Sequence, residues 1–300
     1  MKMHLKTIIG TMRPNFLLLS MVVVLLGTAL ALYDGAEWSI SLFALLMVGG
    51  VLAHACVNMQ NEYEDFKSGL DDLTERTPFS GGSGSLQANP EAASYVLKVL
   101  FGLFAVLIGI GLYLVSLKGW GLLPIGLAGV AVIVTYTSKI THQPWMCLFA
   151  PGLAFGPLMV LGSYYVWTGT FSWGALWVSL VPFFLVNNLL LLNQFPDLEA
   201  DRKVGRYNIL MLLGERRGSQ LFNGFLLLSF VMILMAVWSA ELPTSLLVGF
   251  VTLLLAIPLF NVVSEHYHNI EKLMPALAMN VIINLLTPLL MAGGLLWAIE

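Results

Sequence analysis

Charged residues are scarce in this chain of 300 residues: they make up 10% of it, whereas hydrophobic residues make up 58%. A soluble domain carries about 25% charged and about 45–50% apolar residues, so an ordinary soluble fold is excluded. The net charge of −3 comes without a long basic run, which argues against a nucleic-acid partner. Cysteines are also rare, and because Cys56 and Cys147 both lie in apolar stretches, no disulfide framework is expected. The composition therefore indicates a polytopic membrane protein.

Long uncharged segments occupy most of the chain. A helix of about 20 residues crosses a hydrocarbon core about 30 Å thick. We count nine such segments, which indicate an all-α protein with nine transmembrane helices and a single transmembrane domain, 1–300. They lie within 13–34, 37–62, 98–118, 118–139, 140–196 (two crossings, with a turn expected at 165–173), 217–241, 241–265 and 272–300.

The basic residues fix an orientation for nine crossings. With a cytoplasmic N-terminus, 13 of the 14 lysines and arginines fall on the cytoplasmic side, and Lys118 alone falls outside. This distribution follows the positive-inside rule. We therefore expect a multi-pass protein of a bacterial or archaeal cytoplasmic membrane whose functional site faces the cytoplasm.

Acidic residues gather in two segments on that side. Nine of the seventeen lie in NEYEDFKSGLDDLTER (61–76) and NQFPDLEADRKVGR (193–206), and each segment follows an apolar span. Both begin Asn-x-x-x-Asp, and a spacing of four places the two side chains on one helix face. In the first segment this face continues back to His54 and Asn58, a polar stripe in an apolar helix. Polar groups are costly there unless they face a cavity or a partner.

Clustered carboxylates repel one another, so a cation is their natural partner. Mg²⁺ prefers carboxylate oxygens and keeps positions for substrate phosphates. Basic residues in the same segments are suited to phosphate oxygens; they are Lys67, Arg76, Arg202, Lys203 and Arg206. The glycine-rich loop at 76–84 offers further backbone N–H donors. The pattern indicates a site for a metal and a diphosphate leaving group.

Simpler interpretations stay open for some of these residues. Charged residues next to a membrane are often only solvated, although two segments with the same beginning argue against this. His54 and Asn58 are equally suited to hydrogen bonds between helices, as are Asn280, Asn284 and Thr287 on the last span.

The paired acidic segments resemble the two aspartate-rich motifs of the UbiA superfamily of intramembrane prenyltransferases. Asn61, Asp65 and Asp71 follow the spacing of the branch that prenylates 1,4-dihydroxy-2-naphthoate more closely than that of the 4-hydroxybenzoate branch. The stretches 11–31, 76–84 and 155–169 and the pair Tyr136-Thr137 agree with this resemblance, which extends from Thr11 to about Gly214.

The resemblance implies an α-barrel around a central cavity with a lateral opening for lipid, and Mg²⁺-dependent transfer of a polyprenyl chain from its diphosphate to an aromatic acceptor. For the naphthoate branch, this is a step of menaquinone biosynthesis. The implied metal ligands are Asn61, Asp65, Asp71, Asn193, Asp197 and Asp201, with the four aspartates as the catalytic carboxylates. The implied diphosphate-binding residues are Lys67, Arg76, Lys139, Arg202 and Arg206. The implied cavity or acceptor residues are His54, Asn58, Tyr63 and Tyr136.

Three departures from the family pattern bear on the acceptor. Glu62 stands where an aspartate is usual, the stretch 138–151 has no glutamate that matches the family's Gly-Glu, and Gly205-Arg206-Tyr207-Asn208 replaces Gly-Lys-Arg-Thr. Other acceptors of the superfamily, namely 4-hydroxybenzoate, homogentisate and glyceryl phosphate, therefore stay open.

Other classes of protein explain the acids less well. An ion-coupled transporter places its carboxylates near the bilayer midplane, whereas most acids here lie near one surface. A CDP-alcohol phosphotransferase would need a tighter, single aspartate motif. A membrane scaffold would need neither acidic segment, and the sequence indicates no protein partner.

Overall fold

The computed structural model describes residues 2–73 and 82–299, and within these ranges all regular structure is helical. The all-α class predicted from the sequence is therefore confirmed. In chain order the helices are α1 (Lys2–Thr11), η1 (Pro14–Phe16), α2 (Leu18–Tyr33), α3 (Ile40–Ser68), α4 (Leu70–Leu73), α5 (Ser85–Ala88), η2 (Pro90–Ala92), α6 (Ala93–Lys118), η3 (Trp120–Leu122), α7 (Leu123–Thr135), η4 (Ile140–His142), α8 (Pro144–Leu153), η5 (Ala154–Leu161), α9 (Gly162–Thr168), α10 (Trp173–Lys203), α11 (Ile209–Leu213), α12 (Glu215–Ser239), η6 (Thr244–Thr252), α13 (Leu253–His266) and α14 (Ile270–Trp297).

Seven of the described helices are long and apolar enough to cross a membrane, which makes the chain an integral membrane protein. They are Ile40–Ser68, Pro90–Lys118, Pro144–Thr168, Trp173–Lys203, Glu215–Ser239, Thr244–His266 and Ile270–Trp297. An eighth crossing is counted if His4–Phe16 and Leu18–Tyr33, which are bent by 49°, form one span. The fourth predicted segment contains the shorter apolar helix Trp120–Thr135.

Local sequence signals set the ends of the helices that carry the acidic segments. Ser39 caps α3 by accepting a hydrogen bond from the Leu42 N–H at 3.4 Å, and Ser172 caps α10 in the same way through the Ala175 N–H at 3.0 Å. Gly69 ends α3 in the left-handed conformation, with φ of 76°. Both helices therefore run past their apolar parts and include the first polar turns of each acidic segment.

The turn expected at 165–173 is shorter in the structure. Helix α9 continues to Thr168, and Gly169 then reverses the chain with φ of +74°. Tyr165 and Trp167 are buried, and the Trp167 indole donates a hydrogen bond to Thr28 Oγ1 at 3.0 Å. Packing against α2 therefore holds the aromatic residues in a helix, although the sequence there has turn-like features.

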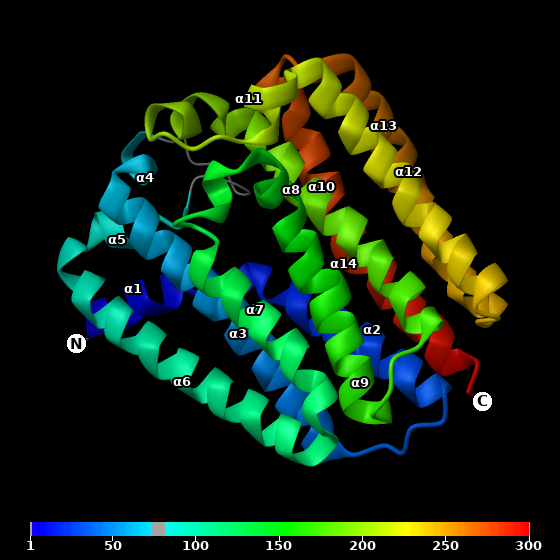
Figure 1. The fold of residues 1–300 in the computed structure, drawn as a ribbon. Coiled ribbons are helices and arrows are strands. Elements are labelled where there is room, and N and C mark those ends of the chain that lie inside the picture. The colour runs from blue at the N-terminus through cyan, green and yellow to red at the C-terminus, as the bar shows by residue number, and fades with distance from the viewer. Residues whose placement is uncertain (1, 74–81, 300) are drawn as a thin grey trace.

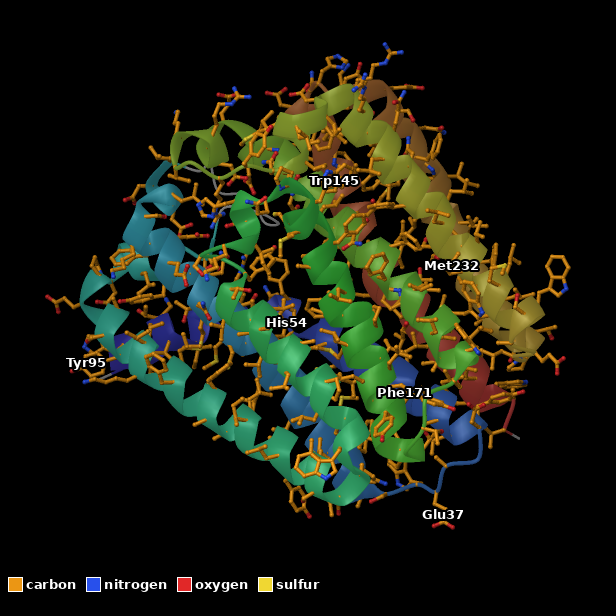
Figure 2. The ribbon with its side chains drawn as sticks, viewed as in Figure 1. Glu37, His54, Tyr95, Trp145, Phe171 and Met232 are labelled. Carbon is orange, nitrogen blue, oxygen red and sulfur yellow. The ribbon has the colours of Figure 1, made fainter. Side chains whose placement is uncertain are left out.

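The helices are arranged around two central elements. Figure 1 shows α10 and α14 running through the middle of the bundle, with α12 and α13 packed along one side and α6 and α7 at the other. Helix α4, which belongs to the first acidic segment, and helix α11, which follows the second, lie at the same end of the bundle (Figure 1). Glu37 lies at the opposite end and His54 lies inside the bundle (Figure 2).

Candidate active site

Two cavities meet at the end of the bundle that carries the acidic segments. The polar cavity has a volume of about 150 Å³ and the apolar cavity about 550 Å³. Their linings share Arg13, Asn61, Tyr136, Leu190 and Asn193, so the two are continuous. The polar cavity is also lined by Asp65, Leu70, Asp71, Gly82, Thr141, Cys147, Gln194, Asp197, Asp201, Arg206 and Asn208.

The first acidic segment enters the polar cavity from the end of α3. The Asn61 amide donates a hydrogen bond to Asp65 Oδ2 at 2.9 Å, so the predicted common helix face is present. Asp71 follows on α4, where it is buried and accepts a hydrogen bond from Gln87 Nε2 at 2.8 Å. A Cβ atom on Gly82 would lie 2.7 Å from Asp71 Oδ1, and Gly82 has φ of +71°. Only glycine fits beside this carboxylate without strain.

The second acidic segment enters from the end of α10, where Asn193, Asp197 and Asp201 all line the same cavity. Asn208 donates to Asp201 Oδ2 at 3.0 Å, and its own Oδ1 accepts the N–H groups of the first turn of α11. Asn208 therefore caps a helix and orients a carboxylate at once. The six metal ligands implied by the sequence resemblance thus line one cavity.

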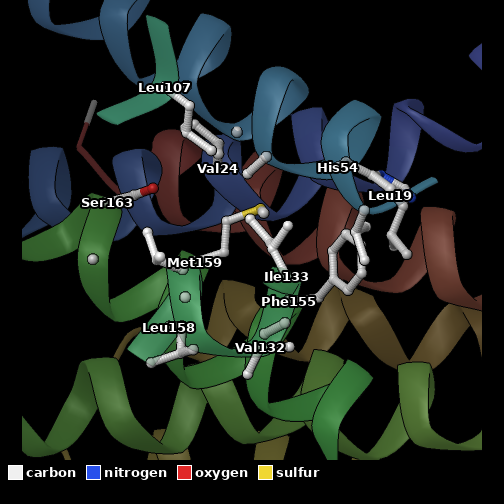
Figure 3. A pocket seen from close by; sticks show the side chains of 18 of the residues that line it. Leu19, Val24, His54, Leu107, Val132, Ile133, Phe155, Leu158, Met159 and Ser163 are labelled. Atoms are coloured by element: carbon white, nitrogen blue, oxygen red, sulfur yellow. The ribbon is translucent and has the colours of Figure 1, made fainter. Parts of the chain in front are cut away.

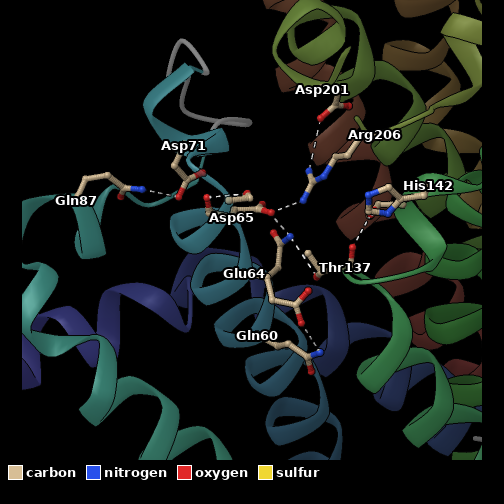
Figure 4. A network of polar contacts seen from close by, with 12 residues as sticks. Gln60, Glu64, Asp65, Asp71, Gln87, Thr137, His142, Asp201 and Arg206 are labelled. Atoms are coloured by element: carbon tan, nitrogen blue, oxygen red, sulfur yellow. Dashed lines mark hydrogen bonds and ion pairs between the residues drawn. The ribbon is translucent and has the colours of Figure 1, made fainter. Parts of the chain in front are cut away.

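Arg206 joins the two segments. Its guanidinium is ion-paired with Asp65 of the first and lies 3.5 Å from Asp201 Oδ1 of the second (Figure 4). Gly205, with φ of +77°, turns the chain back so that the Arg206 N–H also reaches the Asp201 carbonyl at 3.0 Å. Burial alone would lower the pKa of Arg206, but the facing carboxylates of Asp65 and Asp201 raise it above its ordinary value. The guanidinium therefore stays charged.

Glu62 fastens the second half of the glycine-rich loop to α3. Ser83 donates its N–H to Glu62 Oε1 at 2.7 Å and its hydroxyl to Oε2 at 2.6 Å. Arg13 Nε lies 3.7 Å from Glu62 Oε1, and its guanidinium stacks over Phe16 at 4.6 Å from the ring centroid. Glu62, which stands where the family usually has an aspartate, therefore anchors Ser83 to α3.

The apolar cavity carries a buried polar side chain, His54. Its ring contacts Phe155 edge-on, with centroids 4.7 Å apart (Figure 3). His54 is 7% exposed, and its Nδ1 atom has no hydrogen-bond partner among the described residues. Asn58, one turn on, also lines the cavity but donates to the Met12 carbonyl at 3.0 Å. His54 therefore carries a buried polar atom that is free to bond a ligand.

Two other polar residues of the last span, Asn280 and Thr287, bind neighbouring helices, whereas Asn284 bonds within its own helix. Asn280 donates to the Asn188 carbonyl at 3.1 Å, and the Thr287 hydroxyl lies 2.8 Å from that of Thr252. Asn284 donates to the Asn280 carbonyl at 2.9 Å and also lines the apolar cavity. Hydrogen bonds of this kind hold helices together where water is absent.

Three of the remaining sequence candidates lie away from both cavities. Lys67, Lys139 and Arg202 are exposed and line neither of them. Arg202 pairs with exposed Glu199 at 3.0 Å, and Lys67 lies over the Tyr63 ring, 6.0 Å from its centroid. Tyr136, in contrast, lines both cavities. Arg76 lies outside the described residues.

The sequence profile of the UbiA prenyltransferase family matches residues 20–286. The chain belongs to this family. The match begins within α2, ends within α14 and includes both acidic segments that line the polar cavity. The transporter alternative is not supported, because the acids meet at one end of the bundle and not at its middle.

Two curated relatives are similar to this UbiA-family chain. The 1,4-dihydroxy-2-naphthoate octaprenyltransferase of Bacillus subtilis is 30% identical over 207 residues, which cover 68% of this chain and 65% of the relative's own length. The 2-carboxy-1,4-naphthoquinone phytyltransferase of a Synechocystis strain is 22% identical over 299 residues, covering 97% and 93%. Among solved structures, a UbiA homologue from Archaeoglobus fulgidus bound to GPP and Mg²⁺ has a TM-score of 0.64 at 13% identity, covering 97% of this chain and 99% of the homologue.

The donor atoms of the polar cavity suit a hard divalent cation. Every side chain in the implied ligand set offers oxygen, the donor atom that Mg²⁺ prefers. Asn193 Oδ1 is buried and has no hydrogen-bond partner among the described residues, an arrangement that a bound cation would satisfy. Among the residues that the structure describes, no group of three or more His, Cys, Asp or Glu side chains is placed to hold an ion. Arg206 instead lies between Asp65 and Asp201.

Sequence reasoning missed Arg13, Gln194 and Asn208 as residues of the site. In the sequence, Arg13 is only an isolated charge before Pro14. Its position at the site depends on a left-handed backbone, with φ of 53°. Asn208 departs from the family motif, but its Asx-type helix cap is readable from the sequence Asn-Ile-Leu-Met. Gln194 lies next to Asn193 and donates to Cys147 Sγ at 3.8 Å, a contact between distant segments that leaves no sequence signal.

Proposed function

We propose that this chain transfers a polyprenyl group from polyprenyl diphosphate to an aromatic acceptor in a Mg²⁺-dependent reaction. One observation carries the proposal: a polar cavity lined by both aspartate segments opens directly into a larger apolar cavity. The first suits a diphosphate and its metal, and the second suits a hydrocarbon tail and an aromatic ring. Family membership supports the same reaction.

The diphosphate is held in the polar cavity by residues of both segments. Asn61, Asp65, Asp71, Asn193, Asp197 and Asp201 hold Mg²⁺, which supplies positive charge to the diphosphate oxygens when bound. Among the described residues, Arg206 and Arg13 are the cations that line this cavity, and a guanidinium matches phosphate oxygens with paired N–H groups. The other predicted contacts of the diphosphate stay predictions; they are Lys67, Arg76, Lys139 and Arg202.

The chemical step breaks the bond between C1 of the prenyl chain and the diphosphate oxygen. The diphosphate leaves with the electron pair, and the positive groups of the polar cavity stabilise its growing charge. The allylic cation is formed at the junction of the two cavities, where Tyr136 lines both. An aromatic face favours a nearby cation, and the apolar lining beyond it excludes water. A ring carbon of the acceptor then supplies the electron pair for the new C–C bond.

We propose 1,4-dihydroxy-2-naphthoate as the acceptor, and hence a role in menaquinone biosynthesis. The spacing of Asn61, Asp65 and Asp71 and the names of both curated relatives support a naphthalene acceptor. In this reaction the new C–C bond replaces the carboxyl group, which departs as CO₂ and leaves its bonding electrons in the ring. His54 Nδ1 is placed to hydrogen-bond a hydroxyl of such an acceptor within the apolar cavity.

We further propose one transmembrane domain with nine crossings and the polar cavity on the cytoplasmic side. The seven long helices, the bent N-terminal pair and the apolar helix Trp120–Thr135 correspond in order to the nine segments of the sequence. With this topology, 13 of 14 lysines and arginines lie on the side of the acidic segments.

The test is a turnover assay of the purified protein in lipid nanodiscs. Radiolabelled polyprenyl diphosphate and Mg²⁺ are supplied with 1,4-dihydroxy-2-naphthoate, 4-hydroxybenzoate, homogentisate or glyceryl phosphate, and both prenylated product and released diphosphate are measured. We expect product with the dihydroxynaphthoate and its loss on chelation. Product with another acceptor would refute the naphthoate assignment but keep prenyl transfer.

Matched variants test the role of the polar cavity. Asp65→Ala and Asp197→Ala remove lining carboxylates and should lower kcat by at least about a hundredfold. Glu199→Ala removes an exposed carboxylate from the same helix as Asp197 and should leave kcat within about twofold. Full activity in either aspartate variant, or turnover that persists with a chelator, would overturn the proposed site.

A further inference from the structure

We propose that the Arg206 guanidinium occupies the position of a metal ion between the two acidic segments, and that it leaves this position for the diphosphate when the metal binds. The inference rests on the proposed function, in which Asp65 and Asp201 hold Mg²⁺ and Arg206 contacts the diphosphate. In the structure Arg206 is paired with these same two carboxylates, so the two roles exclude each other in this arrangement. An exchange of partners connects them.

Polar contacts already engage every carboxylate oxygen of Asp65 and Asp201. Asp65 Oδ2 accepts a hydrogen bond from the Asn61 amide at 2.9 Å, and Asp201 Oδ2 accepts one from the Asn208 amide at 3.0 Å. The two Oδ1 atoms face a single guanidinium, whose Nη2 atom pairs with Asp65 and whose Nη1 atom lies 3.5 Å from Asp201 (Figure 4). A cation that binds both carboxylates therefore competes with Arg206 for their Oδ1 atoms.

Arg206 is the side chain that moves in this exchange. Asp65 and Asp201 lie within α3 and α10, whereas Arg206 lies in the connection 204–208 between α10 and α11. Its guanidinium is carried by a flexible methylene stem, which can turn while the helices stay in place. In the described ranges no group of three or more His, Cys, Asp or Glu side chains is placed to hold an ion, so metal binding requires a rearrangement of this kind.

The displaced guanidinium has the diphosphate as its next partner. Arg206 lines the polar cavity, so a turn of its side chain keeps the charge beside the bound anion. Arg13 is the other cation among the described residues of this lining, but its partner is Glu62, at 3.7 Å, which is not in the implied ligand set. Metal binding therefore releases Arg206 and leaves the pair of Arg13 in place.

The first experiment measures the affinity for Mn²⁺ by electron paramagnetic resonance in nanodiscs, with no diphosphate present. Arg206→Gln removes the competing cation, whereas Arg13→Gln removes a guanidinium from the same lining that is paired elsewhere. Both variants lose one positive charge near the carboxylates, so only their difference reports the competition. We expect Mn²⁺ to bind at least about tenfold more tightly to Arg206→Gln than to the wild type, and within about threefold of the wild type to Arg13→Gln.

A second experiment uses the unmodified chain and so does not depend on the folding of a variant. Methylglyoxal modifies accessible arginines, and mass spectrometry gives the rate at each one. The Arg206 side chain is 16% exposed, and we expect its rate to rise at least about fivefold with Mg²⁺ alone and to fall again when inorganic pyrophosphate is added. Arg202, which is 59% exposed, is the internal control and should keep its rate within about twofold.

The outcomes separate the exchange from the proposed reaction, because neither measurement needs turnover. Equal Mn²⁺ affinity in the wild type and Arg206→Gln, or an equal gain in Arg13→Gln, would overturn the exchange. An Arg206 modification rate that ignores Mg²⁺, or that rises together with the rate of Arg202, would do the same even if prenyl transfer is confirmed. Release of Arg206 by Mg²⁺ in a protein that turns over no prenyl diphosphate would support the exchange and refute the proposed reaction.

Discussion

Arg206 offers the sharpest test of how the two acidic segments are held together. The variant Arg206→Gln removes the charge that is paired with Asp65 and that lies 3.5 Å from Asp201 Oδ1. The three side chains are 16%, 10% and 11% exposed, so they are largely shielded from water. Removing one partner of a buried ion pair costs about 3–5 kcal/mol, because the other charge stays buried without compensation. Partial exposure lowers this, and we expect a loss of about 2–4 kcal/mol in the free energy of unfolding.

The measurement is denaturant unfolding in detergent micelles with a chelator present. Arg202→Gln is the matched control, because Arg202 lies on the same segment but is 59% exposed, and its ion pair with Glu199 contributes at most about 0.5 kcal/mol. We expect Mg²⁺ to restore part of the stability of Arg206→Gln, since a bound cation compensates the same carboxylates. Equal stability of the two variants, or no effect of Mg²⁺ on Arg206→Gln, would refute this account.

Two further predictions concern packing and the acceptor. Gly152→Ala should lower the free energy of unfolding by about 1–3 kcal/mol, because the new Cβ would lie 2.3 Å from the Phe183 carbonyl oxygen. Gly224→Ala is the control, because Gly224 has open space around it and the change should not destabilise the protein. Thermal unfolding in detergent measures both variants. His54→Phe should raise KM for the aromatic acceptor about tenfold through loss of one hydrogen bond and leave KM for the diphosphate within about twofold. Steady-state kinetics that show the opposite split would contradict the assigned contact.

Helical periodicity explains why the acidic segments were predictable. A spacing of four predicts that Asn61 and Asp65 share one face of α3, and the hydrogen bond between them confirms it. The charge-free segments likewise anticipated an all-helical membrane protein. Both features depend on residues close in sequence or on composition, and local rules carry that information.

Features that depend on contacts between distant segments were not predictable. The pairing of Arg206 with Asp65 joins positions 141 apart, and the position of Arg13 depends on a left-handed backbone before a proline. The sequence predicts too long a turn near position 169, because Trp167 packs against a helix far away in sequence. The contacts of Arg206 and Trp167 form only in the assembled bundle, so they leave no local signal.

The charges that line the polar cavity indicate that its two guanidiniums are not enough to neutralise a bound diphosphate. Among the described residues its lining carries four carboxylates, on Asp65, Asp71, Asp197 and Asp201, but only two guanidiniums, on Arg13 and Arg206. Both guanidiniums already face carboxylates, Arg13 through Glu62 and Arg206 through Asp65 and Asp201. An anionic diphosphate is therefore repelled unless further cations enter with it. The same excess of negative charge disfavours a free anion in the absence of metal, so diphosphate affinity and metal affinity must rise together.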